Sequence, residues 1–316
     1  MGFFGNLMNN FYYGKAGQAD YKESDLPQTR WQLFWEMLKV RLSGLMRLNL
    51  MYFVAWIPTA IVVGIGLLSA LAALSGATDE TVLNGDLSNE LYSLTFFTCL
   101  LLVPCVTLTG PFTAGISYVT RNWSRDEHAF IWTDFKDAIK ENWKQSLPIS
   151  LITSLLPLVA LVSYTFYGDM AVNQPIMVVP QVLVLMIILL WYLAVTYMYP
   201  MIVSYRMSLR DVLRNSFLLA VARLPMSVGI RLLHVVPVLV VVGIAYFTNN
   251  YLWALLGLAV WYLLIGFGLS RFVTASYTNA VFDKFINSRI EGAVVNRGLA
   301  KETEDDWDEE DDSQVE

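Results

Sequence analysis

Residues 91–120 read LYSLTFFTCLLLVPCVTLTGPFTAGISYVT, a run without a single charged side chain. The following residues, 121–130, read RNWSRDEHAF and carry arginines, acids and a histidine within one short segment. About 20 apolar residues in a helix cross the hydrocarbon core of a membrane, which is roughly 30 Å thick. The run is therefore long enough to span a bilayer, and its abrupt charged end indicates where the chain leaves the lipid.

The whole composition agrees with a membrane protein, because 56% of the 316 residues are hydrophobic and only 15% are charged. Soluble domains contain about 25% charged residues. Further charge-free runs cover Leu48–Leu74, Ser146–Tyr167, Met170–Tyr205, Leu232–Phe247 and Tyr251–Ser270. We predict an all-α, polytopic membrane protein whose six transmembrane helices lie near residues 48–74, 91–120, 146–167, 176–205, 224–247 and 251–271. The fifth reaches this length only if Arg231 lies inside the membrane.

The positions of lysine and arginine predict the orientation. These residues precede the first span, separate spans two and three, separate spans four and five, and follow span six. The other connections contain none: SGATDETVLNGDLSNE (75–90), YGDMAVNQP (167–175) and TNN (248–250). Basic residues are enriched in cytoplasmic loops. We therefore expect both termini in the cytoplasm, with residues 1–28 forming an N-terminal cytoplasmic segment ahead of a membrane domain over residues 29–290.

The formal net charge of −6 reflects the C-terminus, where ETEDDWDEEDDSQVE (302–316) contains ten acids and no base. A segment this acidic and poor in apolar residues cannot bury enough surface to fold. We expect residues 291–316 to form an acidic, disordered cytoplasmic tail, with a docking peptide anchored by Trp307 as the alternative. The charge argues against nucleic acid as a partner.

Amphipathic segments precede spans one, three and five. They read TRWQLFWEMLKVRLSGLMR (29–47), WTDFKDAIKENWKQS (132–146) and SLRDVLRNSFLLAVAR (208–223), with apolar or aromatic residues interleaved with bases. Such segments are typical of interfacial helices. The last two resemble each other, and each leads to a Leu-Pro pair, at 147–148 and 224–225. We interpret this as a possible threefold repeat of interfacial helix plus helical hairpin, with chance similarity as the alternative.

No catalytic or metal-binding signature is present. Asp126, Glu127 and His128 are adjacent, so on a helix they point in three directions, whereas a zinc site needs three or four converging ligands. The sequence contains no HExxH, CxxC, GxSxG or P-loop pattern. We predict a protein that is not an enzyme and that has no cofactor or metal.

Polar residues within the spans are the candidate ligand-binding positions: Thr107, Thr109, Thr113, Arg231 and His234. The threonines surround Pro111, so they could line a polar groove or could bond the carbonyl that a proline leaves free in a helix. Arg231 and His234 lie three residues apart on one helix face. They could serve a substrate or a proton, or they could bond to other helices and reach the interface by snorkelling. The small or kinked positions, expected at helix contacts, are Gly110, Pro111, Ala114 and Gly115.

Residues 98–230 resemble the YesL-like family of bacterial integral membrane proteins. The resemblance is carried by Pro104, Thr107, Gly110, Thr113, Ala114, Tyr118, Glu127, Asp134, Phe135, Lys140 and Asn142, and more weakly by Tyr199-Pro200, Asn215 and Leu224-Pro225. The first long span, Leu48–Leu74, departs from shorter relatives, which lack it. Members of this family are often encoded beside carbohydrate ABC importers. The resemblance therefore implies a role next to such an importer in a bacterial cell membrane.

These observations together predict a non-catalytic accessory or assembly protein, associated with a carbohydrate ABC import system. Its expected partners are membrane lipid and the importer subunits. The residues expected to contact a partner on the cytoplasmic side are Asp134, Phe135, Lys140, Asn142, Arg210 and Asn215. The alternative is an independent channel or facilitator for a small neutral solute, using the threonines and Arg231.

Overall fold

The computed structural model describes residues 26–248 and 250–300, and every regular element in them is helical. The helices are α2 (Arg30–Ser75), α3 (Asp79–Leu83), α4 (Asp86–Trp123), α5 (Ile131–Asn173), α6 (Val178–Ser204), α7 (Leu209–Ala222), α8 (Leu224–Thr248), α9 (Tyr251–Trp261) and α10 (Phe267–Phe285), with short helical turns at Pro175–Met177, Tyr262–Gly266 and Asn287–Arg289. Six of the described helical segments are long and apolar enough to cross a membrane. The prediction of an all-α, six-span protein is confirmed.

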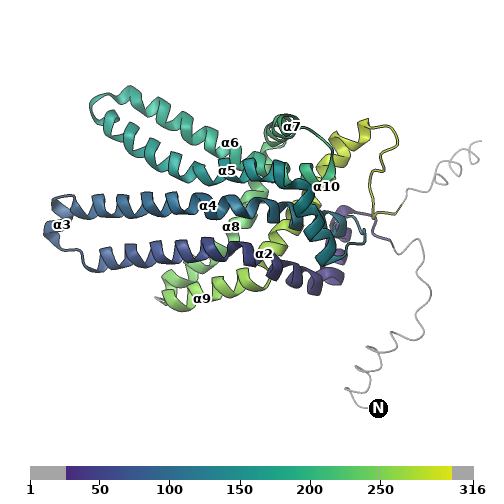
Figure 1. The fold of residues 1–316 in the computed structure, drawn as a ribbon, viewed down its shortest axis with the longest axis horizontal. Helices are drawn as coiled ribbons and strands as arrows, with labels where there is room; N and C mark the ends of the chain where they lie inside the picture. Colours follow the sequence, from purple (N-terminus) through teal and green to yellow (C-terminus); the bar gives the residue numbers. More distant parts are fainter. Residues whose placement is uncertain (1–25, 249, 301–316) are drawn as a thin grey trace, which may run out of the picture.

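The described chain forms three helical hairpins: α2 with α4, α5 with α6, and α8 with α9 and α10 (Figure 1). The base-free connections 75–90 and 167–175 lie at the left of Figure 1, and the amphipathic segments lie toward the right. The first and last described residues also meet at the right, where the Ala300 amide donates to the Pro27 carbonyl at 3.0 Å. The structure therefore places the described ends of the chain on the same side of the six spans.

Two of the expected interfacial helices are continuous with the spans that follow them. The α2 helix begins at a capping box, in which the Thr29 hydroxyl accepts from the Gln32 amide and the Gln32 side chain accepts from the Thr29 amide. It then runs through 46 residues to Ser75, and α5 likewise runs through 43 residues. Only α7 is a separate amphipathic helix. The α7 helix ends at Ala222 with Arg223 as its C-cap, and α8 begins at Leu224 with Pro225 in its first turn, where a missing N–H costs no helical hydrogen bond.

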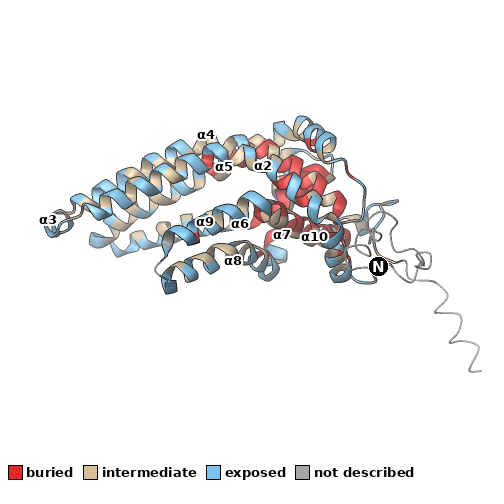
Figure 2. Cartoon of the chain, turned by 90° about the horizontal axis from the view of Figure 1, so that it is seen from below, coloured by how far each residue is buried: buried red, intermediate tan, exposed pale blue. Residues whose placement is uncertain are grey.

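The buried residues gather at one end of the hairpins, drawn in red in Figure 2. In α4 the buried positions begin at Thr109, and in α5 they end at Ser154. In α6 they lie between Trp191 and Val203, where every residue except Tyr192 is buried. The most apolar windows of the six spans are only 6, 0, 22, 17, 0 and 17% buried. The core is therefore at the end that holds the described termini, and the opposite halves of the hairpins are largely exposed.

The tightest packing of the core joins α4 to α5. A Cβ atom on Gly110 would lie 2.7 Å from the Ser146 carbonyl, and one on Gly115 would lie 2.9 Å from the ring and the carbonyl of Phe135. Pro111 leaves the carbonyl of Thr107 without its helical partner, because proline has no N–H. The Ser150 hydroxyl of α5 donates to that carbonyl at 2.7 Å. The proline and the glycine thus serve a single contact between two helices.

A π-helical turn at Tyr262–Gly266 joins α9 to α10 inside the sixth span. The fully buried Asn49 of α2 bonds to both sides of this turn. Its side-chain amide donates to the carbonyls of Tyr262 at 2.9 Å and Leu263 at 2.7 Å, and its oxygen accepts from the Gly268 amide at 2.8 Å. The irregular backbone of the turn is therefore satisfied by a single side chain from another helix.

The sixth helix continues beyond its predicted end. We expected span six to end at residue 271, but α10 extends to Phe285 and its last turns belong to the core, with Phe282 only 1% exposed. The Asn279 side chain donates to the Arg121 carbonyl at 3.2 Å, so Asn279 is level with the end of α4. Arg271 lies eight residues earlier, about 12 Å along the helix axis. Arg271 is therefore at the depth of the apolar runs and not beyond them.

Candidate functional site

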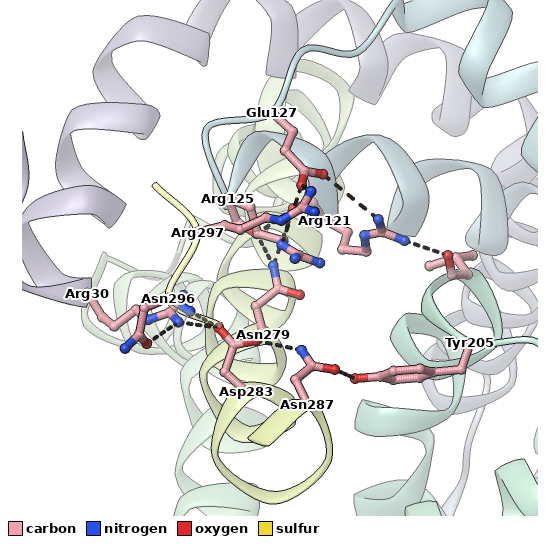
Figure 3. A network of polar contacts seen from close by, with 12 residues as sticks. Arg30, Arg121, Arg125, Glu127, Tyr205, Asn279, Asp283, Asn287, Asn296 and Arg297 are labelled. Atoms are coloured by element: carbon pink, nitrogen blue, oxygen red, sulfur yellow. Dashed lines mark hydrogen bonds and ion pairs between the residues drawn. The ribbon is translucent and has the colours of Figure 1, made fainter. Parts of the chain in front are cut away.

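A network of charged and amide side chains lies at the core end of the molecule, where α4, α6, α10 and the C-terminal described segment meet (Figure 3). After α4 the chain reverses through a turn in which Asp126 adopts a left-handed conformation, with φ of 53°. This turn directs Glu127 back toward the end of α4. Arg297 pairs directly with Glu127, while Arg125 lies 3.8 Å and Arg121 3.9 Å from its carboxylate. Three guanidinium groups therefore share one carboxylate.

Asp283 forms the second centre of the network. It pairs with Arg30 at the start of α2, accepts from the Asn287 side chain at 2.6 Å and accepts from the Asn296 amide at 3.1 Å. Arg30 also donates to the Asn296 side chain at 2.9 Å. The carboxylate thereby fastens the segment after α10 to the N-terminal end of α2. We predicted a disordered tail over 291–316, but its described part, 291–300, packs on the core; residues 301–316 lie outside the described residues.

Two hydrogen bonds connect the two centres to the end of α6. The hydroxyl of Tyr205, just beyond α6, donates to the Asn287 oxygen at 2.7 Å. Burial, together with the nearby Asp283 carboxylate, raises the pKa of Tyr205 to about 12, so this hydroxyl keeps its proton at neutral pH. Arg121 donates to the Val203 carbonyl at the end of α6 at 2.7 Å. The network therefore ties the ends of several helices together.

A cavity of about 230 Å³ lies within this network. Its wall consists of Arg125, Ser204, Tyr205, Asn279, Phe282, Asn287, Gly292, Ala293, Val294 and Arg297. Two polar atoms of these lining residues are buried and have no hydrogen-bond partner, the Ser204 hydroxyl oxygen and Arg125 Nε. The charged residues of the wall are Arg125 and Arg297. Glu127, the acid that pairs with both, is not part of the wall. The cavity is polar and carries positive charge.

The three threonines predicted as ligand-binding residues are engaged in hydrogen bonds on α4. Thr107 donates to the Val103 carbonyl at 2.6 Å and lies 3.1 Å from the Ser154 hydroxyl of α5. Thr109 donates to the Val106 carbonyl at 2.8 Å. Thr113 donates to the Thr109 carbonyl at 2.9 Å, and its hydroxyl lies 2.7 Å from that of Tyr52 of α2. Thr107 and Thr113 therefore join α4 to its neighbours, whereas Thr109 bonds within α4.

Arg231 and His234 form a second, separate group on α8. The His234 ring lies 3.0 Å from the Ser270 carbonyl of α10, and Thr274 lies 3.4 Å from the same ring nitrogen. Arg271, whose guanidinium carbon is 5.7 Å from the Tyr199 ring centroid, is a charged neighbour of Arg231. The sequence places Arg271 at the very end of span six, so it did not predict that Arg271 and Arg231 are neighbours within the membrane domain.

The predicted partner contacts differ in accessibility. Lys140 on α5 and Arg210 on α7 are exposed. Asp134 accepts from the Phe130 amide at 2.9 Å and so caps α5, and Asn142 donates to the Ala138 carbonyl at 2.9 Å within its own helix. Asn215, on α7, is half-buried. Phe135 is 5% exposed because it packs on Gly115, so it is a core residue and its prediction as a surface contact is wrong.

The residues at the centre of the network were visible in the sequence but were not predicted as a site. Asp126, Glu127 and His128 were interpreted only as a charged membrane edge. Of these three, Glu127 pairs with Arg297, which lies 170 residues away along the chain. The His128 ring makes an edge-to-face contact with the Phe130 ring, with 4.7 Å between ring centroids, and takes no part in the network. Among the described residues, no three His, Cys, Asp or Glu side chains are placed to hold a metal ion.

Part of the chain matches a protein-family model. No curated protein and no solved structure matches the chain. The matching segment starts in α4 and ends within α5, and it includes Gly110, Pro111, Glu127 and Ser150. The segment therefore contains the α4–α5 contact and the turn that holds Arg125 and Glu127. This segment, residues 91–164, matches the family described as Protein of unknown function, DUF624.

Proposed function

We propose that this polytopic membrane protein is an accessory or assembly subunit of a membrane complex, with a carbohydrate ABC importer as the partner. The observation that carries the proposal is the position of the core. The six spans pack against one another at one end, whereas their most apolar windows are at most 22% buried. The α2–α4 and α5–α6 hairpins diverge away from this core (Figure 1).

The exposed halves of the hairpins are suited to contact other transmembrane helices. Association of helices in lipid depends on close packing and on hydrogen bonds between helices, not on the exclusion of water. The outer half of α4 presents Phe97 and Leu101, and α6 presents Met186 and Ile187, all between 58 and 65% exposed. These faces can pack against partner helices without rearrangement of the core. The choice of importer follows from the resemblance of residues 98–230 to the YesL-like family.

The proposal is tested by affinity purification of the tagged chain, expressed from its own promoter and extracted in a mild detergent. We expect a permease or ATPase subunit to be retained. Lys140→Glu with Arg210→Glu reverses charge at exposed positions of the core end and should reduce retention several-fold. Glu80→Lys, at an exposed position of the opposite end, is the matched control and should leave retention unchanged. Solute uptake into vesicles by the purified chain alone would contradict the proposal.

The second candidate is a facilitator for a small neutral solute. Arg231 and Arg271 support it, because arginines at the depth of the apolar runs are costly and commonly mark a solute pathway. No acid lies within the described residues of α8, or of α10 before Asp283. Replacement of Arg231 by Leu should abolish uptake by a facilitator. An accessory protein carrying the same change should still purify with its partner.

A further inference from the structure

We propose that the cavity at the core end binds a small oxyanion, with the chemistry of a phosphate or carboxylate group. This inference concerns a ligand of the isolated chain and does not depend on the accessory role. The candidate residues are those of the cavity wall, with Arg125, Ser204 and Arg297 as the principal donors.

The charge balance of the cavity favours an anion. Arg125 and Arg297 lie in its wall, and Arg121 is adjacent through the shared Glu127. The other nearby carboxylate, Asp283, is already paired with Arg30. One carboxylate therefore faces three guanidinium groups, and the Arg125 side chain is only 14% exposed. The Arg121 and Arg125 guanidinium groups are only 16 and 14% exposed and repel each other, and a bound anion would relieve that repulsion.

The unpartnered donors indicate where the anion would lie. The Ser204 hydroxyl is buried without a hydrogen-bond partner, and Arg125 Nε is also buried without one, since its ion-pair partner Glu127 is 3.8 Å away; most buried side-chain polar atoms in proteins have a hydrogen bond. Both belong to the cavity wall, on α6 and just after α4 respectively. Tyr205 cannot supply a further donor, because its proton is bonded to Asn287. An oxyanion with two or more oxygens could accept from Ser204 and from the arginines together.

The size of the cavity limits the ligand. Pockets for drug-sized molecules measure about 300–1,000 Å³. At about 230 Å³, this cavity suits inorganic phosphate with a few waters, or the head of a small phosphorylated or carboxylated molecule. Because the wall combines residues from the ends of α4, α6 and α10 and from the segment 292–297, an occupying anion would join four parts of the chain. We therefore expect binding to stabilise the core end.

The test measures binding of inorganic phosphate to the full-length chain in a phospholipid-free maltoside detergent, with chloride at equal ionic strength as reference. We expect phosphate to raise the unfolding midpoint, as any ligand of the folded state does. Arg125→Gln should weaken the affinity about tenfold or more, and Ser204→Ala about two- to tenfold. Arg214→Gln is the matched control, because Arg214 is exposed on α7 and outside the cavity wall; it should bind as the wild type does.

A parallel arm uses short-chain phosphatidic acid, which carries the same phosphate on a lipid. Stabilisation by phosphatidic acid alone would assign the site to a lipid headgroup, and stabilisation by inorganic phosphate would assign it to a soluble anion. Ser204→Ala keeps every ion pair, so it reports on binding even if Arg125→Gln does not fold. The proposal is overturned if neither compound stabilises the wild type, or if Ser204→Ala and Arg214→Gln respond equally.

Discussion

At the scale of single residues, a few small or polar side chains decide how closely the helices of this protein approach. Gly110 allows α4 to contact the backbone of α5, and Pro111 exposes the carbonyl that Ser150 then bonds at 2.7 Å. In lipid, small residues at a contact allow the backbone-to-backbone packing that holds helices together. The contact is therefore sensitive to added volume.

Replacement of Gly110 by Leu should destabilise the protein by about 1–3 kcal/mol, the usual cost of overpacking a filled contact. The physical reason is that a Cβ there would lie 2.8 Å from Ser150 Cβ. Gly243→Leu on α8 is the control, because a Cβ at Gly243 meets no atom within 4 Å. Unfolding in detergent measures both variants, and equal loss in the two would contradict the assigned contact.

Replacement of Asn49 by Ala should cost about 2 kcal/mol, since it removes three hydrogen bonds and such bonds in membrane proteins average about 0.6 kcal/mol each. The bonds are those to Tyr262, Leu263 and Gly268. Thr59→Val, ten residues along the same helix, is the control, because the Thr59 hydroxyl is buried without a partner. A Thr59 variant as unstable as the Asn49 variant would show that the bonds to the π-helical turn do not matter.

At the scale of elements, α10 and the segment after it close the core end. Asp283 holds this segment through Arg30, Asn287 and the Asn296 amide. Asn279 fastens the same helix to the end of α4 through Ser124, at 2.5 Å. These contacts join α10 to residues far away in the sequence, and they hold its C-terminal end in place.

Asp283→Ala should release the segment after α10 and speed tryptic cleavage at Arg289 or Arg297 several-fold. The reason is that the segment loses its principal acceptor, and local opening is what exposes a chain to a protease. Glu291→Ala removes a carboxylate from the same segment at an exposed position, and it should be cleaved at the wild-type rate. Unchanged cleavage of the Asp283 variant would contradict the role assigned to this carboxylate.

Some features of the helices can be predicted from the sequence, and others depend on contacts that form only in the folded chain. Charge-free runs predicted the six spans, because length and hydropathy alone decide whether a helix can cross lipid. The π-helical turn and the long α10 could not be predicted in this way. They depend on contacts such as Asn49 with Tyr262, which are 213 residues apart. The ion pair of Glu127 could not be predicted for the same reason, since its partner Arg297 becomes its neighbour only in the folded chain.

At the scale of the whole molecule, the core end and the opposite end differ in charge. The opposite end carries the base-free connections, and the core end carries the amphipathic segments and the arginine network. The positive-inside rule predicts that the core end faces the cytoplasm. The cavity would then be open to cytoplasmic anions.

The predicted orientation can be tested by cysteine labelling after replacing Cys99 and Cys105, the two cysteines of the chain, with alanine. A membrane-impermeant maleimide should label Glu80→Cys in intact cells, because α3 would lie outside. It should label Lys140→Cys only after the cells are permeabilised. Both positions are exposed, so access to the reagent is not limited by the fold. The reverse pattern would place the core end outside and contradict the prediction.

The most direct test of the proposed accessory role is photo-crosslinking in living cells from the exposed outer halves of the hairpins. A photoreactive residue is placed at Leu101 of α4 or Ile187 of α6, which are 58 and 65% exposed. We predict light-dependent adducts with the transmembrane subunit of an importer, identified by mass spectrometry. If these positions, and others on the same helix faces, react with lipid alone, the hairpins bind no partner and the account is contradicted.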